Sequence, residues 1–297
     1  MCASDKTEER VKRFPRWLKK KMPAAGEAEK IRGLLKGLKL NTVCQEAHCP
    51  NIYECFSRGT ATFMILGNVC TRNCAFCAVQ YGEPDPPEED EPERVADAAE
   101  QMDLTHVVVT SVTRDDLPDG GSRQFVRTIE ALHRLDGVRA EVLTPDFQGS
   151  EEDIDRVLDA GPAVFNHNIE TVPRLYPEVR PMADYQRSLA VLRRASERTD
   201  GPIVKSGLML GLGEREDELE ELFGDLLDAG CQCLTIGQYL SPSNNHYPVV
   251  EFIPPDTFDW LKERALEMGF QAVAAEPFVR SSYQAGEMAD ELLKEHG

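Results

Sequence analysis

The sequence lacks any long hydrophobic run and any excess of positive charge. None of its 297 residues lies in an apolar stretch long enough to cross a bilayer, and residues 1–10 lack the apolar core of a secretory signal. Lysine and arginine total 33 against 52 aspartates and glutamates, so the formal net charge is −19. This deficit of basic residues argues against nucleic-acid binding through a basic surface. We therefore expect a soluble, cytoplasmic protein that binds neither membrane nor nucleic acid.

One segment reverses the acidic trend. Residues 10–21 contain seven basic residues around Phe14 and Trp17. They form either a solvated arm packed on the folded domain or a docking site for an acidic partner, because complementary charge steers encounter.

The nine cysteines are concentrated, and six of them lie between Cys44 and Cys77. In a cytosolic enzyme, clustered cysteines indicate metal binding more often than disulfides. Cys231 and Cys233 lie outside this group and are two positions apart. On an expected strand, both side chains would point to the same face, which favours a buried core position.

The most informative motif is C-x3-C-x2-C at Cys70, Cys74 and Cys77, directly after a strand-like run at residues 62–67. Three thiolates at this spacing can hold a [4Fe–4S] cluster, and because such clusters normally take four ligands, one iron is left free. With Phe76 before the last cysteine, the motif resembles the signature of radical S-adenosylmethionine (SAM) enzymes, in which SAM chelates the free iron. The alternative is a structural zinc site.

A second triplet, C-x4-C-x5-C, is formed by Cys44, Cys49 and Cys55. Two triplets this close together predict two clusters. His48 lies inside the second one and leaves a zinc site with three cysteines and one histidine open.

Helical and strand-like patterns alternate along the chain after an acidic, proline-rich loop at residues 83–93. An amphipathic helix at residues 27–40 precedes them. Helices are expected at residues 94–102, 122–135, 151–160, 185–198, 216–229 and 256–268. Strands are expected at residues 105–111, 138–144, 163–168, 203–210, 233–237 and 271–275. This alternation predicts an α/β fold, a partial or full TIM-type barrel of about six parallel strands, with an open doubly wound sheet as the alternative.

Polar motifs follow several of these strands, where a barrel places its reactive groups. Residues 110–121 carry hydroxyls, a guanidinium and three carboxylates, although Ser122 as a helix N-cap would explain part of this loop. Asn168 and Glu170 follow the strand at 163–168 and could bind the ammonium and hydroxyls of an amino-acid-like ligand. His167 alone is more typical of a structural histidine.

Two further features point to a small ligand. Arg180 is a candidate partner for a ligand carboxylate, or else a surface arginine. The strand at 203–210 ends in a loop with glycines at 207, 211 and 213, which permit close backbone approach and favour a nucleotide, without matching a P-loop or a dinucleotide fingerprint.

Taken together, these motifs and the terminal Arg280-Ser281-Ser282-Tyr283 resemble the lipoyl synthase family. The likeness covers residues 40–283. The resemblance implies that Cys70, Cys74 and Cys77 hold the SAM cluster. It also implies an auxiliary [4Fe–4S] cluster on Cys44, Cys49 and Cys55, with Ser282 as its fourth ligand.

The resemblance also implies a reaction. SAM is cleaved to a 5′-deoxyadenosyl radical, which takes hydrogen from C6 and C8 of a protein-bound octanoyl-lysine. The auxiliary cluster donates the two sulfur atoms that replace them. The catalytic residues would be the three SAM-cluster cysteines and Ser282. The residues implied to contact SAM are Phe76, Thr110, Ser111, Asn168, Glu170, Arg180, Gly207, Met209 and Gly211.

The expected organisation has three parts. Residues 1–60 form an N-terminal extension that carries the auxiliary cysteines, residues 61–276 form the barrel, and residues 277–297 form a C-terminal extension. Both extensions are expected to cover the barrel mouth. The implied partners are octanoylated carriers, namely the glycine-cleavage H protein and acyltransferase subunits of 2-oxoacid dehydrogenases, and a ferredoxin or flavodoxin as reductant. The basic segment is a candidate contact for such a carrier.

Two alternatives remain at this point. One is another radical SAM sulfur-inserting enzyme of the biotin synthase or methylthiotransferase type. The other is a non-catalytic iron–sulfur or zinc protein.

Overall fold

Parallel strands form the centre of the structure. The computed structural model describes residues 14–19, 26–47, 49–57, 61–283 and 285–295. Its main sheet has the order β1-β2-β5-β6-β7-β8-β9-β10, and all neighbours are parallel except β1 and β2. The strands are β1 (Asn41–Thr42), β2 (Thr62–Ile65), β5 (His106–Ser111), β6 (Arg139–Leu143), β7 (Val164–Asn166), β8 (Ile203–Leu210), β9 (Cys233–Gln238) and β10 (Ala272–Ala275). The predicted α/β fold is therefore confirmed, with the antiparallel β1 as an unpredicted addition.

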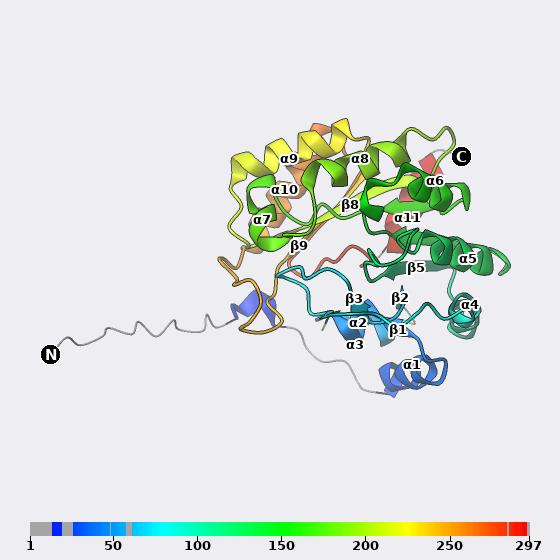
Figure 1. Cartoon of the computed structure of the whole chain (residues 1–297). Helices are drawn as coiled ribbons and strands as arrows, with labels where there is room; N and C mark the ends of the chain where they lie inside the picture. The colour runs from blue at the N-terminus through cyan, green and yellow to red at the C-terminus, as the bar shows by residue number, and fades with distance from the viewer. Residues whose placement is uncertain (1–13, 20–25, 48, 58–60, 284, 296–297) are drawn as a thin grey trace.

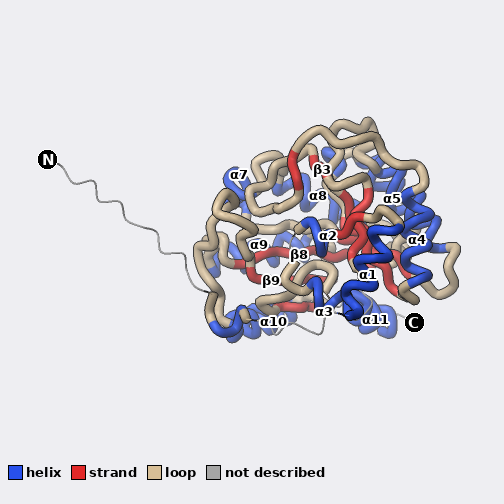
Figure 2. The backbone as a smooth tube through the Cα atoms, turned by 90° about the horizontal axis from the view of Figure 1, so that it is seen from below, coloured by secondary structure: helices blue, strands red, loops and turns tan. Residues whose placement is uncertain are grey.

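Helices cover the outer face of this sheet, as Figures 1 and 2 show. They are α4 (Glu91–Gln101), α5 (Ser122–His133), α6 (Glu151–Asp159), α8 (Tyr185–Ser196), α9 (Glu216–Asp228) and α10 (Pro255–Met268). Each turns an apolar stripe inward; in α5 the stripe is Phe125, Ile129 and Leu132, all fully buried. The predicted bounds agree with the observed ones to within a few residues because this periodicity is strong in all six helices.

Helix α5 begins at Ser122, as predicted, but Ser122 is not its N-cap. Gly121, with a φ of 88°, is the N-cap, and Ser122 is the first helical residue. The Ser122 hydroxyl donates instead to Asp153 Oδ1 at 2.8 Å. This positive φ favours glycine, and a Cβ at position 121 would also lie 2.3 Å from the terminal Cδ1 of Leu66.

The remaining elements are short or terminal. They are η1 (Arg16–Leu18), α1 (Gly26–Gly37), α2 (Val43–Glu46), α3 (Ile52–Ser57), β3 (Val69–Cys70), β4 (Gln80–Tyr81), η2 (Phe147–Gly149), η3 (Pro173–Leu175), α7 (Tyr176–Val179) and α11 (Ala285–Glu295). Of these, only α1 was predicted. Most of the others are too short to show a helical or strand period.

The sheet is a partial barrel. Among the described residues, β1 pairs only with β2 and β10 only with β9, so the sheet does not close. Helix α11 lies at the base, where Ala289 and Leu292 pack against residues that begin four strands: Val164, Ile203, Cys233 and Ala272. The C-terminal extension therefore divides: its helix is at the base, whereas Ser281 contacts Asn168, which follows the end of β7. Cys231 and Cys233 are both buried, as predicted, although they pack in different clusters.

A buried ionic network spans the lower part of the barrel. Lys205 Nζ lies 2.8 Å from Glu141 Oε1, and His106 Nε2 lies 2.9 Å from Glu141 Oε2. Burial opposes ionisation of Glu141, but Lys205 and His106 outweigh it and lower its pKa. A charge buried in this way is tolerated only while its partners stay in place.

In the described part of the chain, no helix is both long and apolar enough to span a membrane.

We predict that Lys205→Met destabilises the protein by about 3–5 kcal/mol at pH 7, because Glu141 then keeps its burial and loses its cation. Urea unfolding of the metal-free protein measures this. The double variant Lys205→Met/Glu141→Leu should regain most of the loss, because an apolar pair of similar volume replaces the ion pair.

The same network predicts a pH dependence. The pKa of Glu141 is lower in the folded state, so its contribution to stability is complete above the unfolded pKa and fades as pH falls through the folded value. The difference between the natural protein and Lys205→Met should therefore shrink in acid. A difference independent of pH would contradict the assignment.

Candidate functional site

Three cysteines converge on one loop at the carboxyl ends of the strands. Cys70 ends β3, and Cys74 and Cys77 follow in the loop to β4, where the Cys77 amide donates to the Cys74 carbonyl at 3.1 Å. The amides of Arg72 and Thr113 donate to Cys70 Sγ at 3.4 and 3.3 Å. Burial raises the pKa of Cys74, and it raises that of Cys77 to about 12; in both cases the neighbouring cysteines add to the effect. Metal binding must therefore release protons from these thiols.

The three thiols of this loop influence one another's pKa, so they lie close together. Three thiolates are the protein ligands that a [4Fe–4S] cluster with one free iron would take. Among the described residues, no group of three or more histidine, cysteine, aspartate or glutamate side chains is placed to hold one metal ion. The alternative zinc site that includes His48 lies outside the described residues.

Arg72, inside the cysteine motif, anchors this loop to the barrel. Its guanidinium contacts Asp115 at 2.6 and 2.8 Å and Asp146 at 2.9 and 2.7 Å, and its side chain is only 6% exposed. Burial opposes ionisation of Asp146, but Arg72 outweighs it and holds the pKa well below the usual range. Sequence reasoning missed Arg72 and Asp146. The position of an arginine between two cysteines of the motif was the signal in the sequence that could have indicated Arg72.

A second segment, the loop from β9 to α10, contacts the cysteine loop from the other side. The Tyr247 amide donates to the Ala75 carbonyl at 2.7 Å, and His246 Nε2 donates to the Cys77 carbonyl at 3.0 Å. The other ring nitrogen of His246 lies 2.8 Å from Ser243 Oγ. These contacts hold the cysteine loop at its backbone. The sequence analysis assigned no role to this segment.

Asn168, Glu170 and Arg180 are brought together beside the cysteine loop. Asn168 Nδ2 donates to Glu170 Oε1 at 3.1 Å, and Arg180 Nη1 donates to the carbonyls of Asn168 and Ile169 at 3.1 and 3.2 Å. Glu170 has a φ of 68°. Burial raises its pKa, and Arg180 acts against that rise. The guanidinium of Arg180 also acts to lower the pKa of Cys74, but burial has the larger effect and the pKa is raised. Arg180 is thus a half-buried side chain whose guanidinium is bound to these carbonyls, not a fully exposed surface arginine.

Two of the three predicted glycines of β8 and its loop, Gly207 and Gly211, serve close packing. A Cβ on Gly207 would lie 2.5 Å from Thr235 Oγ1 and 2.9 Å from Asn168 Oδ1. Gly211 has a φ of 96°, and its amide and that of Leu212 donate to the Glu214 carboxylate at 2.5 and 2.9 Å. Because Glu214 takes these amides, they do not form a phosphate cradle. The glycines allow β8 to approach its neighbours instead.

Buried polar atoms without a hydrogen-bond partner gather at the ends of β5, β6 and β7. They are Ser111 Oγ, Thr144 Oγ1, both amide atoms of Asn166 and His167 Nε2. Buried polar groups are nearly always paired, so this set has unused capacity for a polar ligand.

Of the other predicted residues, Thr110 donates to the Leu143 carbonyl at 2.8 Å, whereas Phe76 and Met209 pack against the core. Burial lowers the pKa of His167 to about 4, so its ring is neutral.

The C-terminal motif meets the first cysteine triplet. Thr62 Oγ1 donates to Ser282 Oγ at 2.7 Å, and Tyr283 donates to Glu54 Oε1 at 2.9 Å. Burial raises the pKa of Cys44 to about 11. Hydrogen bonds between Cys44 and Thr62 act in the opposite direction but are outweighed. Thr62 therefore links Cys44 to Ser282, which lies 220 positions after Thr62 in the sequence.

The neighbouring residues of the motif fill the space between this triplet and the strands. Ser281 exchanges hydrogen bonds of 2.7 and 3.0 Å with the Asn168 side chain. Burial lowers the pKa of Arg280, and the thiol of Cys49 opposes that effect. The motif thus contacts both the auxiliary cysteines and the loop after β7.

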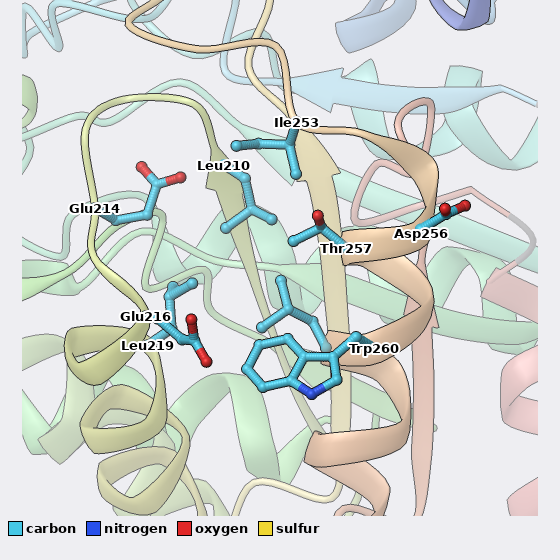
Figure 3. A pocket seen from close by; sticks show the side chains of 9 residues that line it. Leu210, Glu214, Glu216, Leu219, Ile253, Asp256, Thr257 and Trp260 are labelled. Atoms are coloured by element: carbon cyan, nitrogen blue, oxygen red, sulfur yellow. The ribbon is translucent and has the colours of Figure 1, made fainter.

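A separate cavity of about 380 Å³ lies between α9 and α10 (Figure 3). Its lining consists of Leu210, Glu214, Glu216, Leu219, Ile253, Asp256, Thr257, Trp260 and Leu261. None of these is a predicted site residue, although Glu214 accepts a hydrogen bond from the amide of the predicted residue Gly211.

Comparison with known proteins gives matches along most of the chain. A family model described as the radical SAM superfamily matches residues 64–226, and one described as the N-terminal domain of lipoyl synthase matches residues 3–49. The chain is 54% identical over 273 residues to a lipoyl synthase of Caldanaerobacter subterraneus subsp. tengcongensis, covering 92% of this chain and 96% of that protein. It is 53% identical to a lipoyl synthase of Rubrobacter xylanophilus, covering 94% and 88% of the two chains.

Solved structures agree on the fold. Streptococcus suis SuiB bound to S-adenosylmethionine superposes with a TM-score of 0.58 at 11% identity, covering 76% of this chain and 53% of that one. HydG, a maturase of the [FeFe]-hydrogenase, superposes with a TM-score of 0.53 at 16% identity, covering 91% and 75%.

We predict that Arg72→Lys loosens the cysteine loop, because an ammonium cannot form two bidentate contacts with carboxylates. The free energy of unfolding of the metal-free protein should fall by about 2–3 kcal/mol. Iron retained after anaerobic reconstitution and gel filtration should fall at least by about half, since a loosely held ligand set weakens metal binding.

The matched control is Arg194→Lys. Arg194 also contacts an aspartate, Asp155, at 2.8 and 2.6 Å, but its side chain is 35% exposed. Exposed pairs contribute about 1 kcal/mol or less. Equal effects of the two substitutions would show that burial of Arg72 has no special importance.

Proposed function

Because the chain belongs to the lipoyl synthase family of radical SAM enzymes, which insert sulfur into a protein-bound octanoyl group, we propose that its two cysteine triplets bind two [4Fe–4S] clusters. Cys70, Cys74 and Cys77 bind the first, with one iron left for SAM. Cys44, Cys49 and Cys55 bind the second, with Ser282 as the fourth ligand.

One observation carries this proposal. Ser282, near the C-terminus, accepts a hydrogen bond from Thr62, and the same threonine is hydrogen-bonded to Cys44. A C-terminal serine beside the first triplet supplies the ligand that three cysteines lack. The hydroxyl is a weaker ligand than a thiolate, which suits a cluster that must be opened to release sulfur.

We assign the SAM pocket to the strand ends beside the cysteine loop. The implied contacts are Phe76, Thr110, Ser111, Asn168, Glu170, Arg180, Gly207, Met209 and Gly211. The carboxylate of Glu170 and the guanidinium of Arg180 suit the ammonium and carboxylate of a methionyl group. The unpaired Ser111 hydroxyl, with the polar atoms near it, can accept or donate hydrogen bonds to the same ligand.

When bound, SAM and its cluster supply the radical that removes hydrogen from the octanoyl chain, and the second cluster supplies sulfur. The chain's own residues hold these groups in place and exclude water. Arg72 and the β9–α10 loop hold the cysteine loop, whereas Ser281 and Tyr283 hold the serine ligand between the two halves of the site.

The proposal divides the chain into an auxiliary-cluster segment (residues 1–60), a barrel (residues 61–276) and a C-terminal extension (residues 277–297). The substrates are octanoylated carriers such as the glycine-cleavage H protein and the acyltransferase subunits of 2-oxoacid dehydrogenases. A ferredoxin or flavodoxin supplies electrons, and the location is the cytoplasm. Family membership speaks against both alternatives, a different sulfur-inserting radical SAM enzyme and a non-catalytic metal protein.

The test is anaerobic reconstitution followed by incubation with SAM, dithionite and an octanoyl-lysine carrier peptide. We expect about eight irons per chain. We also expect two molecules of 5′-deoxyadenosine per peptide that gains two sulfur atoms and loses two hydrogen atoms. Deoxyadenosine without sulfur gain would contradict the proposed substrate, and zinc without labile sulfide would contradict the clusters.

Ser282→Ala tests the serine ligand. This variant should still cleave SAM but insert far less sulfur, because only the second cluster loses a ligand. Mass spectrometry of the peptide and the Mössbauer spectrum of the variant check this together. Ser196→Ala, an exposed serine on α8, is the control and should match the unsubstituted enzyme. Normal sulfur insertion by Ser282→Ala would contradict the assignment.

A further inference from the structure

We propose that the η1 segment is a docking surface for the acidic protein that carries the octanoyl-lysine, an inference that rests on the proposed function. The surface consists of Phe14, Arg16, Trp17 and Lys19, which we call the rim patch. It would hold the carrier while the acyl chain enters the barrel.

The composition of the rim patch is typical of a protein interface. Phe14 is 54% exposed and Trp17 is 40% exposed, while Arg16 and Lys19 are also exposed. Leu18, between them, is buried and anchors the segment. Exposed aromatic and arginine side chains are enriched at interface centres and contribute most of the binding energy there.

The position of the rim patch connects it to the reaction site. The Phe14 ring lies 5.5 Å from that of Phe252, at an angle of 39°. Phe252 belongs to the β9–α10 loop, the segment whose Tyr247 and His246 contact the cysteine loop. In Figure 1, η1 lies against this loop. A protein bound at the rim patch would therefore stand beside the SAM-cluster cysteines.

Charge selects the kind of partner. The chain carries a formal charge of −19, and seven of its acidic residues lie at positions 83–93. An acidic carrier is repelled by most of such a surface and attracted where Arg16 and Lys19 are exposed, which orients its approach. The basic residues at positions 10, 12, 13, 20 and 21 lie outside the described residues. The charge of the rim patch therefore comes from Arg16 and Lys19 alone. A second copy of this chain is a poorer partner because two strongly acidic proteins repel one another.

Substrate geometry adds a requirement. Octanoyl-lysine is a single flexible chain, and ordering it inside the barrel costs conformational entropy. A carrier held at the rim converts the entry of that chain into an intramolecular event and raises its effective concentration. A free peptide gains nothing from the rim patch.

The test compares two octanoylated substrates, the intact H protein and a short lysine peptide, with the variant Arg16→Glu/Lys19→Glu. We expect kcat/KM to fall about tenfold or more with the intact carrier, because rim charges set the encounter rate, and to stay unchanged with the peptide. Trp17→Ala should lower kcat/KM by a similar factor with the intact carrier and should not change it with the peptide. Raising the salt concentration should lower carrier turnover by the unsubstituted enzyme and affect the charge variant little.

The matched controls lie on the outer helices. Arg193→Glu/Lys262→Glu introduces the same change in charge on α8 and α10, and Trp260→Ala removes a tryptophan that is 38% exposed beside the α9–α10 cavity. Both should leave turnover of the carrier unchanged. A loss equal to that of the rim variants would mean that net charge matters and the rim patch does not, and would overturn the proposal.

Binding of the octanoylated carrier to the reconstituted protein without SAM or reductant, measured by anaerobic calorimetry, decides the docking independently of activity. Weaker binding by the rim variants than by the controls would support the proposal even if no sulfur were inserted, whereas absent sulfur insertion into both substrates would contradict the proposed function. Unchanged binding, equal losses with carrier and peptide, or a rim effect confined to self-association would overturn the docking site.

Discussion

The geometry of the site depends on one buried guanidinium. Arg72 lies between the two SAM-motif cysteines Cys70 and Cys74, and its four hydrogen bonds join that loop to Asp115 and Asp146 at the ends of two neighbouring strands. A charge buried without its partners costs several kcal/mol, so the cysteine loop has little freedom to move relative to the barrel. The loop contains almost no regular structure of its own. Its position is therefore set by an ion pair with the sheet rather than by its own backbone.

A second constraint joins the two ends of the chain. Ser282 and Tyr283 contact Thr62 and Glu54, more than 200 positions earlier in the sequence. Such contacts carry the entropy cost of closing a long loop, and they form only because the barrel has already brought both segments to one end. Helix α11 then packs at the base, where Arg139 pairs with Asp290 of this helix. The proposed second cluster thus depends on the completed fold.

The barrel itself was largely predictable. Strand β8 was predicted with the bounds that the structure shows, because a long apolar strand between two strongly amphipathic helices has no competing pattern. Short elements were missed for the opposite reason: α2 spans four residues and β1 two, too few for a period to appear. The alternative of Ser122 as the N-cap of α5 was wrong, because its hydroxyl donates to Asp153, which is distant in sequence. Tertiary contacts there overrode a local preference.

For the site, the sequence by itself determined the chemistry: two cysteine triplets at recognisable spacings, polar motifs after the strands and a terminal serine motif. These signals are local, since ligand spacing and residue type are written along a few consecutive positions. Only the tertiary structure decided which of these groups meet. It placed Ser282 beside Cys44 through Thr62, made Arg180 a partner of the Asn168 carbonyl and bound Arg72 to two carboxylates. Contacts of this kind depend on strand order and on the burial of charge, and neither quantity can be read from a local pattern.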